Sequence, residues 1–262
     1  MFGFRRRRRA RLRATPVPSS WNDIIARNVP YVRLLDDDER RRLLGEVRVF
    51  LDEKEVVGCG GLEITDEIRV TIAAQACLLL IGRESDVYPM LGRILVYPHP
   101  YRAHTVRPQP DGTVVEGEEG RLGESWHRGA LVLAWDAVVG GARDVHDGHN
   151  VVLHEFAHQL DSESGGMEGA PLLPDRAALA RWARVMTAEY AELLDEIERD
   201  HRTVMDRYGA TNPAEFFAVA TETFFEKPRA LARRHAELYA LLRDFYGQDP
   251  ARRFAAGTPD EA

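Results

Sequence analysis

Apolar residues recur at the three- and four-residue spacing of helices over most of the chain, which predicts a mainly helical protein. Acidic residues in the first turn support two of the predicted starts, because they complement the positive end of the helix dipole. An Asn-Pro pair supports another start, since proline fits the first helical turn. The predicted helices span residues 20–27, 36–53, 65–81, 151–161, 175–205, 212–225 and 229–246.

The pattern changes between residues 87 and 135, where short apolar runs alternate with proline and glycine. Such runs are typical of β-strands, which we predict at residues 93–97, 112–117 and 130–135. Residues 136–150, which contain several glycines and histidines, are expected to form a loop. The predicted fold class is therefore α+β, mainly helical with a small mixed sheet.

The two ends of the chain lack this pattern. Residues 1–20 contain the arginine run Arg5–Arg9 and close on a proline-containing segment, so we expect a flexible basic leader. Contact with a membrane surface or with nucleic acid is the alternative role of this leader. Residues 251–262 are expected to form a tail, which leaves one domain over residues 21–250.

Composition narrows the classes of function. The net charge of -7 gives the folded domain no electrostatic basis for binding nucleic acid. Cys59 and Cys77 match no disulfide framework and no Cys-x-x-Cys motif, which favours a reducing compartment. No apolar run is long enough to act as a signal peptide or to span a membrane, so we predict a cytoplasmic protein.

The candidate chemistry lies in residues 151–161, an apolar segment that contains a His-Glu-x-x-His motif. Residues four apart share one face of a helix, so His154 and His158 can bind the same metal ion. Glu155 is then placed to hold a water molecule and act as general base, which is the arrangement of zinc hydrolases. The alternative is a core helix whose histidines bond to backbone or to carboxylates.

A hydrolytic zinc ion needs a third protein ligand and one open position. A metzincin would continue the motif with Gly and His where this chain has Asp161 and Ser164, so the third ligand must come from another element. Asp161 can instead accept a hydrogen bond from a ligating histidine, or cap the following loop. Zincin clefts commonly have an edge strand beside the motif helix, and residues 130–135 are the candidate, to which an extended substrate could add.

The apolar helix predicted at residues 212–225 carries two glutamates, Glu215 and Glu222, seven residues apart and facing much the same way. Buried carboxylates need partners, so one can ligate the metal while the other orients a ligand from behind. The residues alone do not decide between the two. Glu215 could also form a capping box with Asn212, and Glu222 could pair with an arginine.

Two segments closely resemble the Mlc titration factor A family of bacterial zinc-dependent peptidases: His-Glu-Phe-Ala-His-Gln-Leu-Asp at 154–161 and Asn-Pro-Ala-Glu-Phe-Phe-Ala at 212–218. Residues 123–126 and 131–135 resemble the family's segment before the motif helix. The likeness covers about residues 20–250 and omits the arginine-rich leader. It implies a zincin-like metallopeptidase fold of the gluzincin type, with one zinc ion per chain. Matching the Asn-Pro-Ala-Glu phrase places the third ligand at Glu215 and leaves Glu222 behind it.

The resemblance also implies an activity. The expected reaction is hydrolysis of a peptide or protein substrate, with a zinc-activated water and Glu155 as the base. Tyr208 matches the position of a tyrosine that donates to the oxyanion in related gluzincins, although it could instead pack its ring beneath the turn. Aminopeptidase action would need an acidic group for the substrate's amine, for which Glu163 and Glu168 are candidates.

A second function is implied by the same family. Its members resemble regulators that bind the transcriptional repressor Mlc and keep it from DNA. The chain could therefore act mainly by binding a repressor protein, with weak peptidase activity. Nothing in the sequence identifies a surface for such a partner, so the peptidase is the primary expectation.

Overall fold

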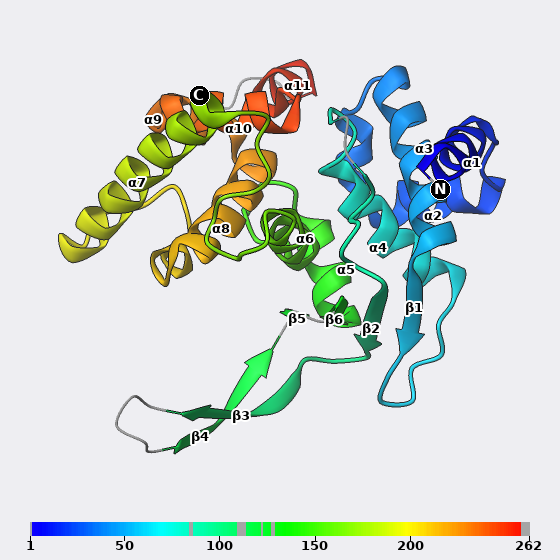
Figure 1. The fold of residues 1–262 in the computed structure, drawn as a ribbon, viewed down its shortest axis with the longest axis horizontal. Coiled ribbons are helices and arrows are strands. Elements are labelled where there is room, and N and C mark those ends of the chain that lie inside the picture. The colour runs from blue at the N-terminus through cyan, green and yellow to red at the C-terminus, as the bar shows by residue number, and fades with distance from the viewer. Residues whose placement is uncertain (1, 84–85, 109–113, 122, 127–128, 258–262) are drawn as a thin grey trace.

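The computed structural model describes residues 2–83, 86–108, 114–121, 123–126 and 129–257, and helices dominate these segments (Figure 1). The helices before the histidine motif are α1 (Phe2–Ala14), α2 (Ser19–Asn28), α3 (Asp37–Glu53), α4 (Asp66–Leu78) and α5 (Trp135–Arg143), with the short 3-10 helix η1 (Pro30–Leu34). The motif and the chain after it form α6 (Val151–Ser162), α7 (Arg176–Glu198), the 3-10 helix η2 (Arg207–Ala210), α8 (Pro213–Glu226), α9 (Pro228–Arg234), α10 (Ala236–Tyr246) and α11 (Pro250–Gly257). Every helix predicted from the sequence has a counterpart.

A mixed sheet lies beside the helices, in the order β1-β2-β6-β5. The strands β1 (Glu55–Gly58), β2 (Arg93–Tyr97) and β6 (Ala130–Ala134) are parallel, and β5 (Gly123–Trp126) runs antiparallel to β6. A separate antiparallel pair joins β3 (Tyr101–Pro108) to β4 (Val114–Arg121). The predicted α+β class with a small mixed sheet is thus confirmed, while part of the strand predicted at 112–117 falls outside the described residues, at 112 and 113.

The strand at the edge of the sheet is not the one predicted from the sequence. The prediction of residues 130–135 as the edge is wrong, because β6 pairs with β2 on one side and β5 on the other. Four of its five residues are buried, as expected for an interior strand covered on both faces. The edge beside α6 is formed by β5, which pairs with β6 on one side only and therefore presents a row of backbone groups at the end of the sheet.

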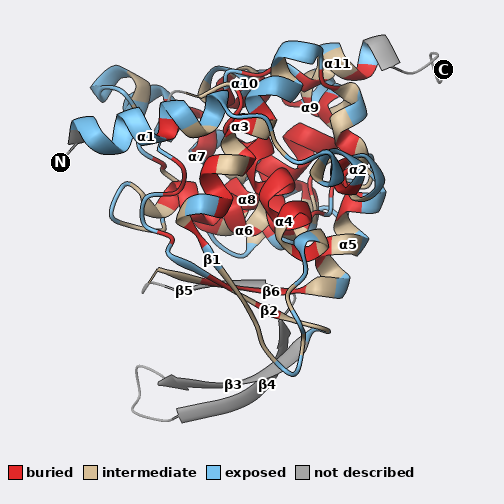
Figure 2. Cartoon of the chain, turned by 90° about the vertical axis from the view of Figure 1, so that its right-hand side faces the viewer, coloured by how far each residue is buried: buried red, intermediate tan, exposed pale blue. Residues whose placement is uncertain are grey.

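The core is centred on α4, α6 and α8, in each of which most residues are buried (Figure 2). Phe156 of α6 packs edge-on against Tyr88, with ring centroids 4.7 Å apart, and contacts Phe50 of α3 at 5.7 Å. α8 is buried along nearly its whole length, as its continuous apolar sequence predicts. The motif helix is therefore held by packing on several sides before any metal is considered.

The loop predicted over residues 136–150 contains a helix, α5. Its glycines argued against a helix in the sequence, but Val138 and Ala142, four residues apart, are buried on one face. A Cβ atom at Gly141 would lie 3.0 Å from the carbonyl oxygen of His149. The glycine thus allows α5 to lie against the chain that enters α6, which is a packing requirement that the local sequence does not reveal.

Two other helices differ in length from the prediction. The helix expected at 175–205 ends with α7 at Glu198, and Asp200 takes a left-handed backbone conformation with φ of 54°. The helix expected at 229–246 is divided at His235 into α9 and α10. This division places His235 at a junction between helices, where its side chain faces α7.

Both ends of the chain contain helices, which differs from the flexible leader and tail predicted above. Arg9 of α1 is buried and donates to Glu53 of α3, with Nε–Oε1 at 2.6 Å and Nη2–Oε2 at 2.7 Å. At the other end, Arg253 of α11 pairs with Glu39, and Phe254 is buried. Acidic residues of α3 thus provide partners for basic residues that the sequence indicated as solvated, while the division into leader, domain and tail stays a prediction.

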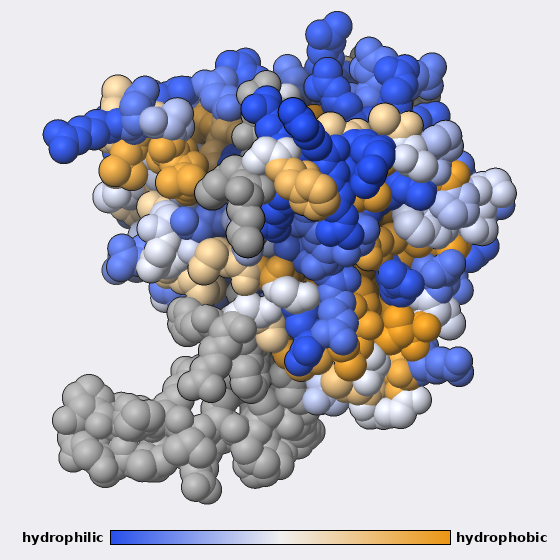
Figure 3. Space-filling view, turned by 45° about the vertical axis from the view of Figure 1, so that its right-hand side comes forward, coloured by the Kyte–Doolittle hydropathy of each residue, from blue (hydrophilic) through white to orange (hydrophobic). Residues whose placement is uncertain are grey.

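Among the described residues, no helix is both long and apolar enough to cross a membrane. The face of the molecule shown in Figure 3 is largely hydrophilic, with apolar residues gathered in separate patches. The long apolar stretches of the sequence are accounted for by the core around α4, α6 and α8.

Candidate metal centre

The two motif histidines lie on α6, whose start is fixed by Asn150. The Asn150 side chain accepts hydrogen bonds from the backbone N–H groups of Val152 and Leu153, each at 3.1 Å. With the helix started there, His154 and His158 project from the same face, with ring centroids 4.9 Å apart. The two histidines therefore share one helix face, as their spacing in the sequence predicts.

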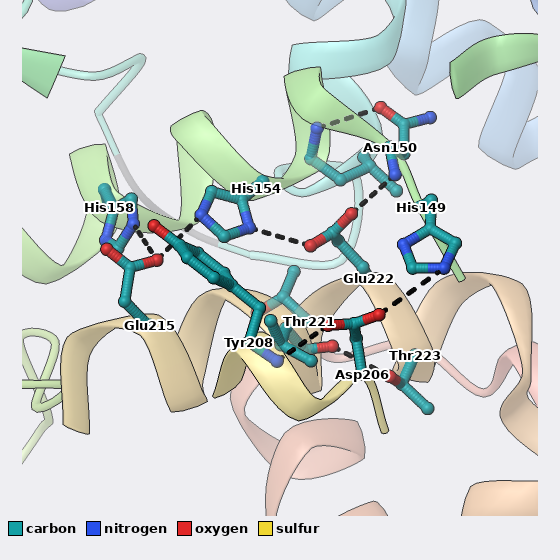
Figure 4. A network of polar contacts seen from close by, with 12 residues as sticks. His149, Asn150, His154, His158, Asp206, Tyr208, Glu215, Thr221, Glu222 and Thr223 are labelled. Carbon is teal, nitrogen blue, oxygen red and sulfur yellow. Dashed lines mark hydrogen bonds and ion pairs between the residues drawn. The ribbon is translucent and has the colours of Figure 1, made fainter. Parts of the chain in front are cut away.

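α8 brings Glu215 to these rings (Figure 4). Its Oε2 atom lies 3.0 Å from Nε2 of His154 and 3.4 Å from Nε2 of His158. Asn212 caps α8 by accepting from the N–H groups of Ala214 and Glu215, which is one half of the capping-box alternative. The Glu215 side chain nevertheless reaches the two imidazoles.

Glu222 contacts the opposite side of His154. Its Oε1 atom lies 2.7 Å from Nδ1 of His154, and its Oε2 accepts from the backbone N–H of Asn150 at 2.5 Å (Figure 4). Such a carboxylate behind a histidine fixes which ring nitrogen carries the proton and which is free for a metal. Glu215 and Glu222 thus take the two arrangements that the sequence left open: Glu215 lies at the Nε2 nitrogens of both histidines, and Glu222 lies behind the ring of His154.

The pKa directions show strong electrostatic coupling in this group. Burial opposes a charge on His154, but hydrogen bonds to Glu215 and Glu222 raise the pKa of this histidine to about 10. Burial alone would raise the pKa of Glu215, but the hydrogen bonds from His154 and His158 lower it to about 2. The site therefore favours positive charge between the carboxylates and the imidazoles.

The donors of His154, His158 and Glu215 all lie within 4.8 Å of one another. Ligands about 2.0–2.1 Å from a tetrahedral zinc ion are about 3.3 Å apart, so the 3.0 Å and 3.4 Å separations suit such an ion. Two imidazole nitrogens and one carboxylate oxygen are also a donor set that catalytic zinc sites use. These residues fit a zinc ion without rearrangement of the helices.

Glu155 is buried beside the two histidines on α6. Burial raises the pKa of its carboxyl group, although the neighbouring histidines oppose the shift. Its Oε2 atom is buried with no hydrogen-bond partner in the described part of the chain. A buried carboxylate oxygen without a partner is costly in a purely structural role.

Tyr208 borders the site from η2. The residue is 54% exposed, and the centroid of its ring lies 6.0 Å from that of His154. Figure 4 shows the hydroxyl end pointing toward His158 and Glu215. Asp206 supports this turn, because its side chain accepts from the backbone N–H of Tyr208 at 2.7 Å. The phenol therefore lies at the open side of the site.

Asp161 takes the loop-anchoring arrangement. Its oxygens accept from the backbone N–H groups of Gly169 at 2.7 Å and Ala170 at 2.8 Å. No hydrogen bond joins it to His158, whose Nδ1 is buried without a partner among the described residues. Asp161 therefore ties the loop after α6 to the helix that carries the histidines.

Asn150 and Asp206 were not among the residues singled out in the sequence. Asn150 also donates from its side chain to Glu226, so it joins the start of α6 to two glutamates of α8. An asparagine directly before a helix is a recognisable capping signal. Its contacts with α8 depend on helix packing, and Asp206 likewise acts through a turn that no local pattern predicts.

In this α+β fold, two histidines of one helix and a glutamate of another lie close together beside a buried carboxylate. This arrangement is typical of metal-dependent hydrolases. The family described as glucose-regulated metallo-peptidase M90 matches residues 4–247, and the chain belongs to this family. The match begins within the arginine-rich segment, so it extends further toward the N-terminus than the resemblance traced from the motifs.

Similar proteins support this assignment. A protein of Synechocystis sp. named only as uncharacterized is 45% identical over 90% of this chain and 86% of its own length. Mlc titration factor A of Serratia proteamaculans is 34% identical over 90% of this chain and 89% of its own. Mlc titration factor A of Escherichia fergusonii is 32% identical, covering 92% and 91%. A metal cofactor follows from the family's description as metallo-peptidases.

Replacing Glu222 by Gln tests the carboxylate behind His154. We expect zinc affinity, measured by calorimetric titration of metal-free protein, to fall about 10–100-fold, because the ring loses its charged partner. Glu226→Gln is the matched control: burial raises the pKa of Glu226 to about 9, so it is already neutral at pH 7. Equal losses in both variants would mean that buried carboxyls on α8 support only packing.

Proposed function

We propose that this protein is a zinc-dependent peptidase of the gluzincin type, with His154, His158 and Glu215 as ligands of one zinc ion. The observation that carries this proposal is the convergence of their three donor atoms within 4.8 Å, next to a buried glutamate. Membership of a metallopeptidase family supports the reaction class. The zincin-like fold is supported by the motif helix lying beside a mixed sheet with an antiparallel edge strand.

The bound ion would polarise the scissile carbonyl and lower the pKa of a water molecule. Glu155 accepts the proton of the attacking water and later delivers it to the leaving amine, for which a carboxyl with a raised pKa is suited. Glu222 holds the ring of His154 in one orientation through Nδ1. The backbone of β5 provides an edge to which an extended peptide can add.

Tyr208 is the proposed oxyanion donor. Its hydroxyl points toward the site from an exposed turn, so it can reach a bound substrate (Figure 4). A preorganised donor of this kind stabilises the negative charge that develops on the carbonyl oxygen. Endopeptidase and aminopeptidase action both remain compatible with this arrangement, since Glu163 and Glu168 follow the motif helix as candidates for an amine.

Replacing Glu155 by Gln should separate metal binding from catalysis. We expect peptide cleavage to fall about 10²–10⁴-fold, because the base is lost, while zinc content stays unchanged. Cleavage of a peptide library and elemental analysis of the same sample measure both quantities. Glu198→Gln, an exposed position of α7, is the control for the chemical change. Wild-type cleavage by the Glu155 variant would contradict the mechanism.

Replacing Tyr208 by Phe removes the hydroxyl and keeps the ring. We expect kcat to fall about 10²–10³-fold with zinc affinity unchanged, as for loss of one oxyanion donor. If the ring serves only to pack beneath the turn, phenylalanine preserves that role and kcat remains at the native value. Steady-state kinetics on one defined peptide decides between the two.

A regulatory role is the second candidate, favoured by relatives named Mlc titration factor A that are 32% and 34% identical to this chain. In this function the protein binds a transcriptional repressor and peptide cleavage is secondary. The predicted cytoplasmic location suits both candidates.

A pull-down with an Mlc-type repressor tests this role. We expect the native chain to retain the repressor, and the double variant His154→Ala, His158→Ala to retain it equally if binding is independent of the metal. Absence of binding by both proteins, together with efficient cleavage of a defined peptide by the native chain, would leave the peptidase as the function.

A further inference from the structure

A second group of metal-binding side chains lies away from the motif, where α7 meets the junction of α9 and α10. It consists of Glu189, Glu192 and His235, whose ligand atoms all lie within 4.8 Å of one another. We propose that these three residues bind a divalent transition-metal ion, distinct from the ion of the motif helix. Neither the family match nor the relatives' names indicate such a site.

The geometry of the group follows from the elements that carry it. Glu189 and Glu192 are three residues apart on α7 and therefore share one face of the helix. His235 ends α9 and begins α10, and its Nδ1 atom lies 2.8 Å from Oε2 of Glu189. α7 packs against α10 and α8, and α8 packs against α6, so α8 lies between α7 and the helix that carries the motif histidines.

Burial makes the group costly without a cation. His235 is 2% exposed and Glu189 is 8% exposed, whereas Glu192 is exposed and provides access from solvent. Glu196, on the same helix, is 7% exposed. Within the described residues, the guanidinium paired with this set is that of Arg234, which donates to Oε1 of Glu196 at 2.9 Å.

A protonated His235 would supply one positive charge for three neighbouring glutamates, which compensates their charge only in part. Nδ1 of His235 lies 2.8 Å from Oε2 of Glu189, a contact that either a proton or a metal ion can bridge. The other ring nitrogen, Nε2, is buried with no partner in the described part of the chain, so Nδ1 is the nitrogen that faces Glu189. Oε2 of Glu196 is also buried without a partner among the described residues. Glu196 therefore adds a buried carboxylate oxygen without a partner among those residues, on the helix face that carries Glu189 and Glu192.

A divalent ion would replace the proton between His235 and Glu189. One imidazole and two carboxylates are a donor set suited to zinc, manganese or iron, with water completing the coordination through the exposed side of Glu192. These residues join α7 to the junction of α9 and α10. The ion would therefore hold α7 against that junction. The group lacks a glutamate placed like Glu155, so we assign it a structural effect.

Zinc binding to the full chain tests the proposal. Metal-free protein is dialysed against buffered zinc at low micromolar free concentration, and zinc per chain is measured by elemental analysis. We expect about two ions on the native chain, about one on Glu192→Gln and about one on His158→Ala, with none on the combined variant. Glu198→Gln, the same change at an exposed position of α7, should retain both.

The outcomes distinguish the two sites. A single ion lost in His158→Ala and kept in Glu192→Gln would overturn the second site and leave the proposed peptidase centre intact. A single ion lost in Glu192→Gln alone would support the second site and contradict the peptidase centre. Thermal unfolding gives a second readout: zinc should raise the Tm of His158→Ala, and this rise should be absent when Glu192→Gln is added.

Discussion

Two carboxylates of one buried helix reach the same imidazole, and the rest of the site depends on this arrangement. Glu222 contacts Nδ1 of His154 and Glu215 faces Nε2, although both glutamates come from α8. Their separation of seven residues, two helical turns, fits one histidine ring only if α6 and α8 pack at a fixed position. Buried negative charge of this kind is unfavourable unless a cation or proton compensates it. The helix pair is thus arranged for a positive charge.

Asn150 connects that electrostatic requirement to the backbone. It starts α6 with its side-chain oxygen, donates its N–H to Glu222 and its side-chain amide to Glu226. Burial raises the pKa of Glu226 to about 9, so this glutamate is neutral at pH 7. The start of the motif helix is thus fixed relative to Glu222, the carboxylate that orients its first histidine.

The sequence could predict whatever depends on neighbours along one helix. The spacing of His154 and His158 gives their common face directly, and the apolar run of α8 indicates its burial. It could not rank Glu215 against Glu222, because both project similarly and the difference lies in which ring nitrogen each meets. α5 was missed for a related reason, since Gly141 serves the close approach of a distant segment. The group around His235 joins residues 46 positions apart and has no local pattern.

The two candidate metal sites are built in the same way but differ in the residues that could take part in a reaction. In each, one helix supplies two carboxylates and a neighbouring element supplies an imidazole. The motif cluster adds a second histidine, a buried glutamate on the same helix and an exposed tyrosine at its open side, which together can move a proton and stabilise an oxyanion. Among the described residues, the cluster on α7 has a single histidine, and its buried glutamate Glu196 lies on the helix that also supplies the two carboxylate ligands. A cation there would act on the packing of α7 against α10. Its loss should therefore lower the free energy of unfolding more than it lowers the rate of peptide cleavage.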